Sequence, residues 1–76
     1  MNARIVIDPE VQHGKPVIRG TRVPVSRVVG GLAGGMTFEE VMRAYDVSEE
    51  DVRAALDYAT EIIEGEVLLP LPIPAA

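Results

Sequence analysis

The sequence contains no cysteine, no tryptophan and only one histidine, His13. Without cysteine, the chain can form neither a disulfide nor a thiolate zinc site. His13 has no second histidine with which to share a metal and no carboxylate in an evident catalytic arrangement, so we interpret it as a polar loop residue. We therefore expect a protein that is not an enzyme, with no catalytic residues, no metal site and no cofactor.

Long hydrophobic runs are also absent. No apolar stretch approaches the roughly 20 residues that cross a bilayer, and the first residues lack the basic and apolar pattern of a signal peptide. We therefore predict a cytoplasmic protein without membrane contact. A chain of 76 residues allows one small domain of marginal stability, and its apolar content of 47% indicates a surface buried on a partner or in a homodimer.

Positive charge is scarce in the second half of the chain. Residues 1–35 contain five Lys or Arg against two acidic residues, a net charge of +3, whereas residues 36–76 contain two Arg against ten acidic residues, a net charge of −8. This asymmetry indicates two faces with different partners. Acidic residues that simply coat solvated helices would also explain much of the second half.

Residues 14–25 combine two prolines, two glycines and three cations, and we interpret them as the stretch that organises the chain. The prolines restrict the backbone, while glycine permits a sharp turn. This composition predicts a rigid loop or small hairpin that holds Arg19 and Arg22 outward, ready for an anion. The alternative is a plain connection from strand to helix with solubilising cations. The candidate residues for DNA or partner binding are Lys15, Arg19, Gly20, Thr21, Arg22 and Arg27.

One short strand precedes this stretch and one helix follows it. The β-branched run Ile5–Ile7 predicts a strand, which must pair with Val17–Ile18, with Val23 or with another subunit. Apolar residues at helical spacing predict a helix that begins at Pro24 or the next residue and ends at Gly34–Gly35. The β element is therefore expected at the N-terminal side of a helical body.

Two more helices follow. Thr37 and Glu40 have the spacing of a capping box before a helix that runs through Tyr45. Ser48 is expected to cap a third helix that ends at Gly65. The apolar stripes expected to face the core are Val25, Val28, Val29 and Leu32, then Phe38, Val41, Met42 and Tyr45, and finally Val52, Ala55, Leu56, Ala59, Ile62 and Ile63.

The last two helices and their short connection resemble a helix-turn-helix. In that motif the second helix enters the major groove, but here its first turn carries Glu49, Glu50 and Asp51, which DNA phosphates would repel. If DNA is bound, we therefore expect the basic stretch and the first helix to make the contacts. The alternative is a helical hairpin that forms only core and dimer surface.

The stretch 66–76 is expected as an extended, proline-rich tail beyond a single domain of residues 1–65. Alternating prolines forbid a helix and favour a strand-like or polyproline conformation. The tail is too apolar to be explained by disorder alone, so it lies on its own core or docks on a partner. Its candidate contact residues are Val67, Leu68, Leu69, Leu71 and Ile73.

The chain resembles a bacterial family, domain-of-unknown-function family number 433, over roughly residues 3–60. The most specific part of the resemblance is the run Gly14–Val25, with its sequence Gly-Lys-Pro-Val-Ile-Arg-Gly-Thr-Arg-Val-Pro-Val. The matching pieces that follow in register are Leu32–Ala33, Gly35, Glu39–Val41, Tyr45, Glu50–Val52 and Ala54–Ala59. The resemblance implies a mainly α, homeodomain-like or helix-turn-helix domain of three helices with a short N-terminal β-hairpin-like element.

The resemblance also implies a function. It implies an antitoxin that neutralises a cognate PIN-like ribonuclease toxin. We expect this antitoxin to be a homodimer or higher oligomer, and autoregulatory binding of operator DNA through the basic stretch is a second hypothesis. The tail would then supply contacts with the toxin. Two alternatives remain open: a DNA-binding transcriptional regulator without a toxin, and a non-catalytic subunit that completes an enzyme site with Lys15 or Arg22 as an anion clamp.

Overall fold

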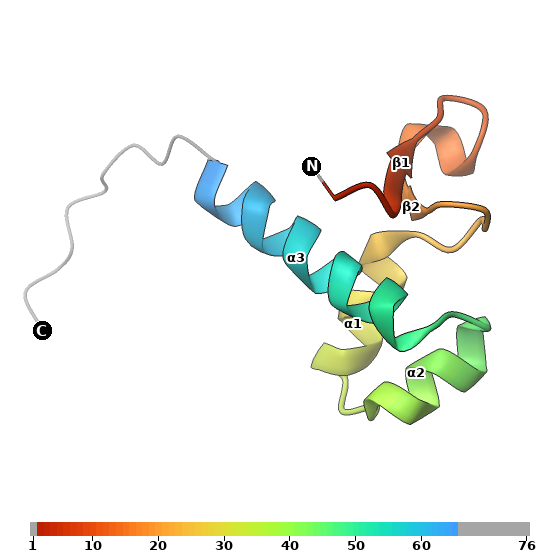
Figure 1. Ribbon diagram of the computed structural model, residues 1–76, viewed down its shortest axis with the longest axis vertical. Coiled ribbons are helices and arrows are strands. Elements are labelled where there is room, and N and C mark those ends of the chain that lie inside the picture. The colour runs from red at the N-terminus through yellow and green to blue at the C-terminus, as the bar shows by residue number, and fades with distance from the viewer. Residues whose placement is uncertain (1, 66–76) are drawn as a thin grey trace, which may run out of the picture.

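The N-terminal residues form a two-stranded antiparallel sheet (Figure 1). The computed structural model describes residues 2–65, in which β1 (Ile5–Ile7) pairs with β2 (Pro16–Ile18) and Ile5 lies opposite Ile18. The predicted pairing of Ile5–Ile7 with Val17–Ile18 is therefore confirmed. A single bridge between Val17 and Pro24 then brings the chain back along β2 to the first helix.

A left-handed turn connects the two strands. The segment η1 (Gln12–Gly14) has the hydrogen bonds of a short 3-10 turn, but its residues have φ values of 50°, 57° and 83°. The N–H groups of Gly14 and Lys15 donate to carbonyl oxygens three residues earlier, each at 3.1 Å. His13 is exposed in this turn, so it occupies the polar loop position expected for it.

Three α-helices follow: α1 (Val25–Ala33), α2 (Phe38–Tyr45) and α3 (Glu49–Gly65). Capping boxes fix two of the helix starts. Thr37 and Glu40 exchange hydrogen bonds of 2.9 and 3.1 Å at the start of α2, and Ser48 and Asp51 exchange bonds of 3.0 and 3.1 Å at the start of α3. The predicted mainly α fold of three helices with a short N-terminal β element is confirmed.

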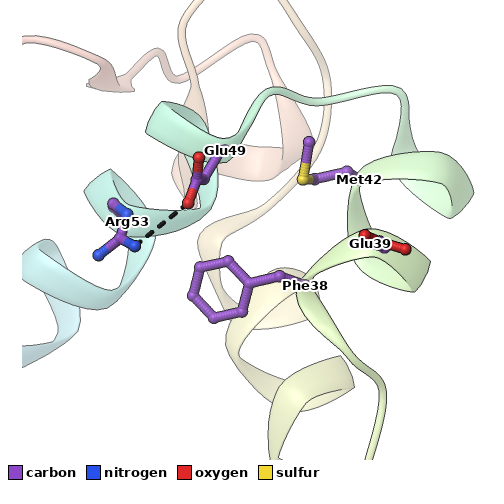
Figure 2. A pocket seen from close by; sticks show the side chains of 5 residues that line it. All are labelled: Phe38, Glu39, Met42, Glu49 and Arg53. Carbon is purple, nitrogen blue, oxygen red and sulfur yellow. Dashed lines mark hydrogen bonds and ion pairs between the residues drawn. The ribbon is translucent and has the colours of Figure 1, made fainter.

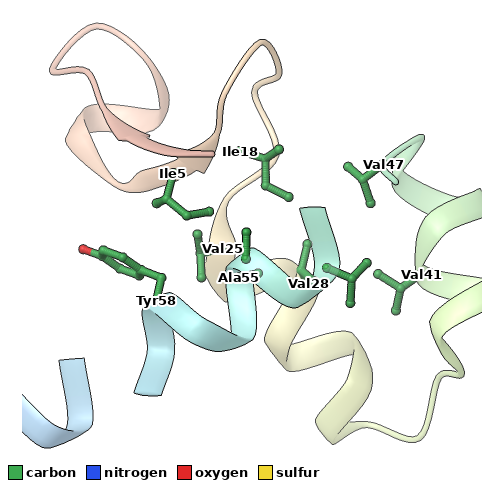
Figure 3. Close-up of a cluster of buried hydrophobic side chains, with 10 residues drawn as sticks. Ile5, Ile18, Val25, Val28, Val41, Val47, Ala55 and Tyr58 are labelled. Carbon is green, nitrogen blue, oxygen red and sulfur yellow. The ribbon is translucent and has the colours of Figure 1, made fainter. Parts of the chain in front are cut away.

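The core is built from aliphatic side chains of the sheet and all three helices (Figure 3). Val28 of α1, Val41 of α2 and Val52 of α3 are completely buried, and Ile5 and Ile18 add the sheet to the same cluster. These residues belong to the predicted strand and stripes. The core side chains are short and mostly aliphatic, and α3 packs through them against both α1 and β1.

One of the two central glycines of α1 permits a close approach to α2. A Cβ added at Gly31 would lie 3.0 Å from the Met36 sulfur and 3.5 Å from Val41 Cγ2, whereas one added at Gly30 would meet nothing within 4 Å. The close packing of α1 against α2 therefore involves Gly31 and not Gly30.

The last turns of α3 extend past α1 (Figure 1). α3 has 17 residues and α1 has nine. The expected apolar stripe of α3 is buried at Val52 and Ala55, and Tyr58 is buried with them, but Ile62 is 47% exposed and Ile63 is 67% exposed. The stripe therefore enters the core along only its first half.

Residues 66–76, predicted to form the proline-rich tail, lie outside the described residues. The division into a domain of residues 1–65 and a tail therefore stays a prediction. Within residues 2–65, no helix has the length and the apolar character needed to cross a bilayer.

Candidate partner-binding surfaces

Residues 19–22, which we call the basic turn, lead from β2 toward α1. Gly20 has a φ of 80°, the positive value that the third position of a type II turn requires. The N–H and the hydroxyl of Thr21 both donate to the Ile18 carbonyl oxygen, at 3.0 and 2.8 Å, and the Thr21 hydroxyl oxygen accepts from the Val23 N–H at 3.0 Å. The hydrogen bonds therefore make this segment a braced turn rather than a loose connection.

The two arginines of the basic turn have different surroundings. Arg19 Nε donates a hydrogen bond of 2.7 Å to the Ala3 carbonyl oxygen, which ties the turn to the residues before β1. Arg22 is exposed and forms no ion pair within residues 2–65, and the same is true of Arg27 on α1. Arg22 and Arg27 are therefore available to an anionic partner.

Lys15 lies apart from the basic turn. It precedes β2 and the turn follows β2, so about 13 Å of extended chain separates Lys15 from Arg19. The structure therefore does not gather the predicted binding residues into one patch. Lys15 instead stands at the edge of an apolar groove that sequence reasoning did not find.

The N-terminus of α3 is acidic and locally braced. Asp51 accepts hydrogen bonds from the Ser48 N–H and from Arg4, each at 3.0 Å. Partial burial acts to raise the pKa of Asp51, but these hydrogen bonds and the positive charge of Arg4 outweigh it, so the pKa lies below its ordinary value. With Glu49 and Glu50 beside it, this end of α3 presents negative charge, which suits a basic partner better than a phosphate backbone.

A pocket of about 410 Å³ lies between α2 and α3 (Figure 2). The guanidinium carbon of Arg53 stands 5.7 Å from the centroid of the Phe38 ring, and Arg53 donates to Glu49 at 3.1 Å. Glu39 and Met42 complete the lining. Because Glu49 already pairs with the only cation of this pocket, we interpret the contacts as packing between the two helices.

A larger depression, which we call the α1–α3 groove, has a volume of about 560 Å³. Among residues 2–65, Lys15 is the only charged residue that lines it, and its walls are otherwise mostly aliphatic. The unequal lengths of the first and third predicted helices were the one signal that could have pointed to it. The groove is lined by Lys15, Pro16, Val25, Ser26, Val29, Tyr58, Ala59, Ile62 and Ile63.

The chemistry offered by these surfaces is that of binding. Within residues 2–65, no three His, Cys, Asp or Glu side chains cluster in a way that could hold a metal ion. The basic turn offers unpaired cations, the start of α3 offers carboxylates, and the α1–α3 groove offers apolar area. Three surfaces of different character therefore lie on one small domain.

Comparison with known proteins identifies the domain. The family described as "Protein of unknown function (DUF433)" matches residues 5–59. A protein of Mycobacterium tuberculosis named "Putative antitoxin VapB45" is 41% identical over 56 residues, which cover 74% of this chain and 23% of that protein. The "Uncharacterized protein y4eO" of Sinorhizobium fredii is 38% identical over 56 residues, which cover 72% of this chain and 25% of that protein. This chain thus spans about a quarter of the length of these relatives.

Two crystal structures share the fold. Rv2018 from Mycobacterium tuberculosis superposes with a TM-score of 0.64 at 42% identity, over 70% of this chain and 25% of that one. A DUF433 member protein from Anabaena variabilis superposes with a TM-score of 0.74 at 33% identity, over 82% of this chain and 62% of that one. The likeness to both covers more than two thirds of this chain.

Proposed function

Because this chain belongs to the DUF433 family, we propose that it is an antitoxin-like binding protein that neutralises a PIN-like ribonuclease toxin. The observation that carries the proposal is the 41% identity with the relative named as an antitoxin, over 74% of this chain. We propose further that the chain is not an enzyme, that it acts in the cytoplasm as a homodimer or higher oligomer, and that the shared domain is enough for toxin binding.

The charge of the helical body supports a basic partner. Residues 36–65 contain nine Asp or Glu against two Arg, and the hydrogen bonds to Asp51 keep its carboxylate ionised. A ribonuclease needs a basic groove to bind RNA, and an acidic surface would occupy such a groove through charge complementarity. In this scheme α2 and α3 cover the substrate-binding surface of the toxin.

We propose that the segment 66–76 adds apolar contacts to the same complex. An extended chain with regularly spaced apolar side chains can dock in a groove or along the edge of a sheet on its partner. The side chains proposed to contact the toxin are Val67, Leu68, Leu69, Leu71 and Ile73.

The product of the adjacent reading frame provides the test. We expect its expression alone to arrest bacterial growth and its co-expression with this chain to restore growth. In calorimetry, a variant in which a Gly/Ser sequence of equal length replaces residues 66–76 should bind the toxin at least about tenfold more weakly, because it loses several buried aliphatic side chains.

An adjacent gene that encodes a metabolic enzyme, or a product that does not bind this chain, would contradict the proposed function. Equal affinities of the natural chain and the Gly/Ser variant would contradict only the role of the segment 66–76. The two parts of the proposal are therefore tested separately.

We propose autoregulatory DNA binding as a second function, supported by the exposure of Arg22 and Arg27 without ion pairs in residues 2–65. Since the start of α3 is acidic, the basic turn and α1 would face the DNA, with α3 turned away. The double variant Arg22→Ala, Arg27→Ala should then bind operator DNA more weakly, with a salt dependence flatter by about 0.9 for each lost phosphate contact.

Arg43→Ala is the matched control for this measurement. Arg43 is also exposed without an ion pair in the described part of the chain, but it lies on α2. If Arg43→Ala reduces the affinity and the salt slope as much as Arg22→Ala or Arg27→Ala alone, the proposed DNA-binding face is wrong.

A further inference from the structure

We propose that the α1–α3 groove binds the proline-rich segment 66–76 of the same chain. This inference concerns the chain without any partner, and it therefore goes beyond the proposed function. It rests on the chemistry of the groove, on the sequence of the segment and on the point where the described residues end.

The lining of the α1–α3 groove suits an uncharged, apolar occupant. Val25 and Val29 of α1 form one wall, and Ile62 and Ile63 of α3 form the other. These two isoleucines keep 47% and 67% of their surface exposed, the largest exposed aliphatic area on the helices among residues 2–65. Exposed neighbouring aliphatic groups on a small domain mark a surface that gains free energy when it is covered.

The sequence of the segment matches this requirement. Glu66 is its only charged residue, and prolines alternate with aliphatic residues from position 69 to position 74. In an extended chain, side chains two positions apart point to the same side, so Leu69, Leu71 and Ile73 share one face. Proline has no N–H to donate, and in an extended chain the three missing N–H groups lie on the same edge, so contacts along that edge are made by side chains.

The groove begins beside the residues that immediately precede the segment in the sequence. Ile62 and Ile63 lie three and two residues before Gly65, where α3 and the described residues end. Glycine at the end of a helix readily permits the chain to reverse. After a reversal over three residues, positions 69 to 73 span about 13 Å of extended chain, enough to run from the end of α3 toward Pro16.

The covalent link to α3 also favours the segment 66–76 over a separate peptide as the occupant of the groove. A segment joined by a few residues to the rim of its own groove has an effective concentration in the millimolar range, so modest contacts suffice. The fixed φ angles of three prolines further reduce the conformational entropy that is lost on docking. If the segment also contacts the toxin, it would leave the groove when the complex forms.

The absence of tryptophan from the sequence gives a direct test. In the full chain, Leu71→Trp places a single indole in the segment. We expect its emission to be shifted to shorter wavelength and protected from acrylamide relative to the same chain in 6 M guanidinium. Ile73→Trp provides a second reporter in case the indole at position 71 does not fit.

Ile63→Asp in the reporter background should lower the docked population at least about tenfold and expose the indole, since it places a charge where docking would bury an aliphatic group. Ala44→Asp adds the same charge on α2, which does not line the groove, and should leave the indole protected. Because Ile63 is exposed among the described residues, the variant should keep its helical circular dichroism.

Indoles that are solvated at both reporter positions in the folded chain would overturn the inference. Protection that disappears on dilution from the micromolar to the nanomolar range would also overturn it, because it would assign the groove to the segment of a second copy. Protection that Ile63→Asp does not change would mean that the segment binds elsewhere. None of these measurements involves a toxin, so their failure leaves the proposed function untouched.

Discussion

Gly20 shows how one backbone angle places the neighbouring arginines. Its φ of 80° lies where residues with a side chain are strained, and a Cβ built there would meet no atom within 4 Å. Gly20→Ala should therefore destabilise the fold by about 1 kcal/mol through backbone strain alone. Thermal unfolding, in which this loss corresponds to about 4–8 °C for a domain of this size, provides the measurement.

Gly30→Ala is the control for this change, and it should shift the stability in the opposite direction. Gly30 lies within α1, and a Cβ there would also meet nothing within 4 Å. Because alanine is the better helix former, this variant should be more stable by roughly 0.5–1 kcal/mol. A Gly20→Ala variant as stable as Gly30→Ala would show that the turn does not need a positive φ.

The ionisation of Asp51 makes the stability of the fold depend on pH. Its pKa is lowered in the folded chain, so its stabilising effect is fully present above the pKa of the unfolded chain, about 3.9, and is lost as pH falls through the lower folded value. At pH 7, Asp51→Asn should reduce the free energy of unfolding by about 1 kcal/mol, the usual magnitude of a capping interaction. The difference between the two proteins should shrink as pH falls below the pKa of the unfolded chain and the native carboxylate becomes protonated.

Glu50→Gln separates this effect from a general loss of negative charge. Glu50 is exposed in the same helical turn and forms no hydrogen bond or ion pair with other residues of the described range. Melting temperatures measured from pH 7 to pH 2 should fall in parallel for Glu50→Gln and the natural protein. A pH dependence of Asp51→Asn that also parallels the natural protein would refute the role given to the Asp51 carboxylate.

At the scale of elements, α2 depends on its first turn. It has only eight residues, of which one is fully buried, so the capping box at Thr37 contributes a large share of the free energy that stabilises α2. Thr37→Ala should cost about 1 kcal/mol. Thr60→Ala on α3 is the matched control: the Thr60 hydroxyl donates only to the Leu56 carbonyl within the helix, and its loss should change stability by less than about 0.5 kcal/mol. Equal losses in urea unfolding would contradict the capping argument.

The bounds of the helices could be predicted because their signals are local. Thr37 with Glu40 and Ser48 with Asp51 fix two helix starts through contacts three residues apart, and the structure contains all four hydrogen bonds. Burial along α3 could not be predicted in the same way. Periodicity shows which face of a helix is apolar, but the number of turns that are covered depends on the length of α1, its neighbour in space.

The same distinction applies to the candidate surfaces. The basic turn could be expected because Gly20 and the flanking prolines act on their own backbone. The separation of Lys15 from that turn, and its position at the α1–α3 groove, follow from the pairing of β2 with β1. The left-handed angle of Gln12 had no signal in the sequence, and that of His13 had only a weak one, since histidine is enriched at positive φ but usually has a negative φ.

At the scale of the whole molecule, charge governs how the chain meets the proposed toxin. The net charge is −5, and the acidic excess lies in the second half of the sequence. The association rate with a basic ribonuclease should therefore fall by roughly tenfold between 50 and 500 mM salt, while the dissociation rate changes little. Stopped-flow measurements would test this, and an association rate independent of salt would exclude electrostatic steering.

The unequal lengths of α1 and α3 also affect how such proteins diverge. The first three turns of α3 pack against the core, so few substitutions are tolerated there. Positions 62 and 63 are exposed and contribute little to the stability of the packed core. Substitutions at these two positions would change how firmly the α1–α3 groove holds its occupant and would leave the packed half of α3 intact. Proteins that share this domain are therefore expected to differ more at this end of α3 than along its first half.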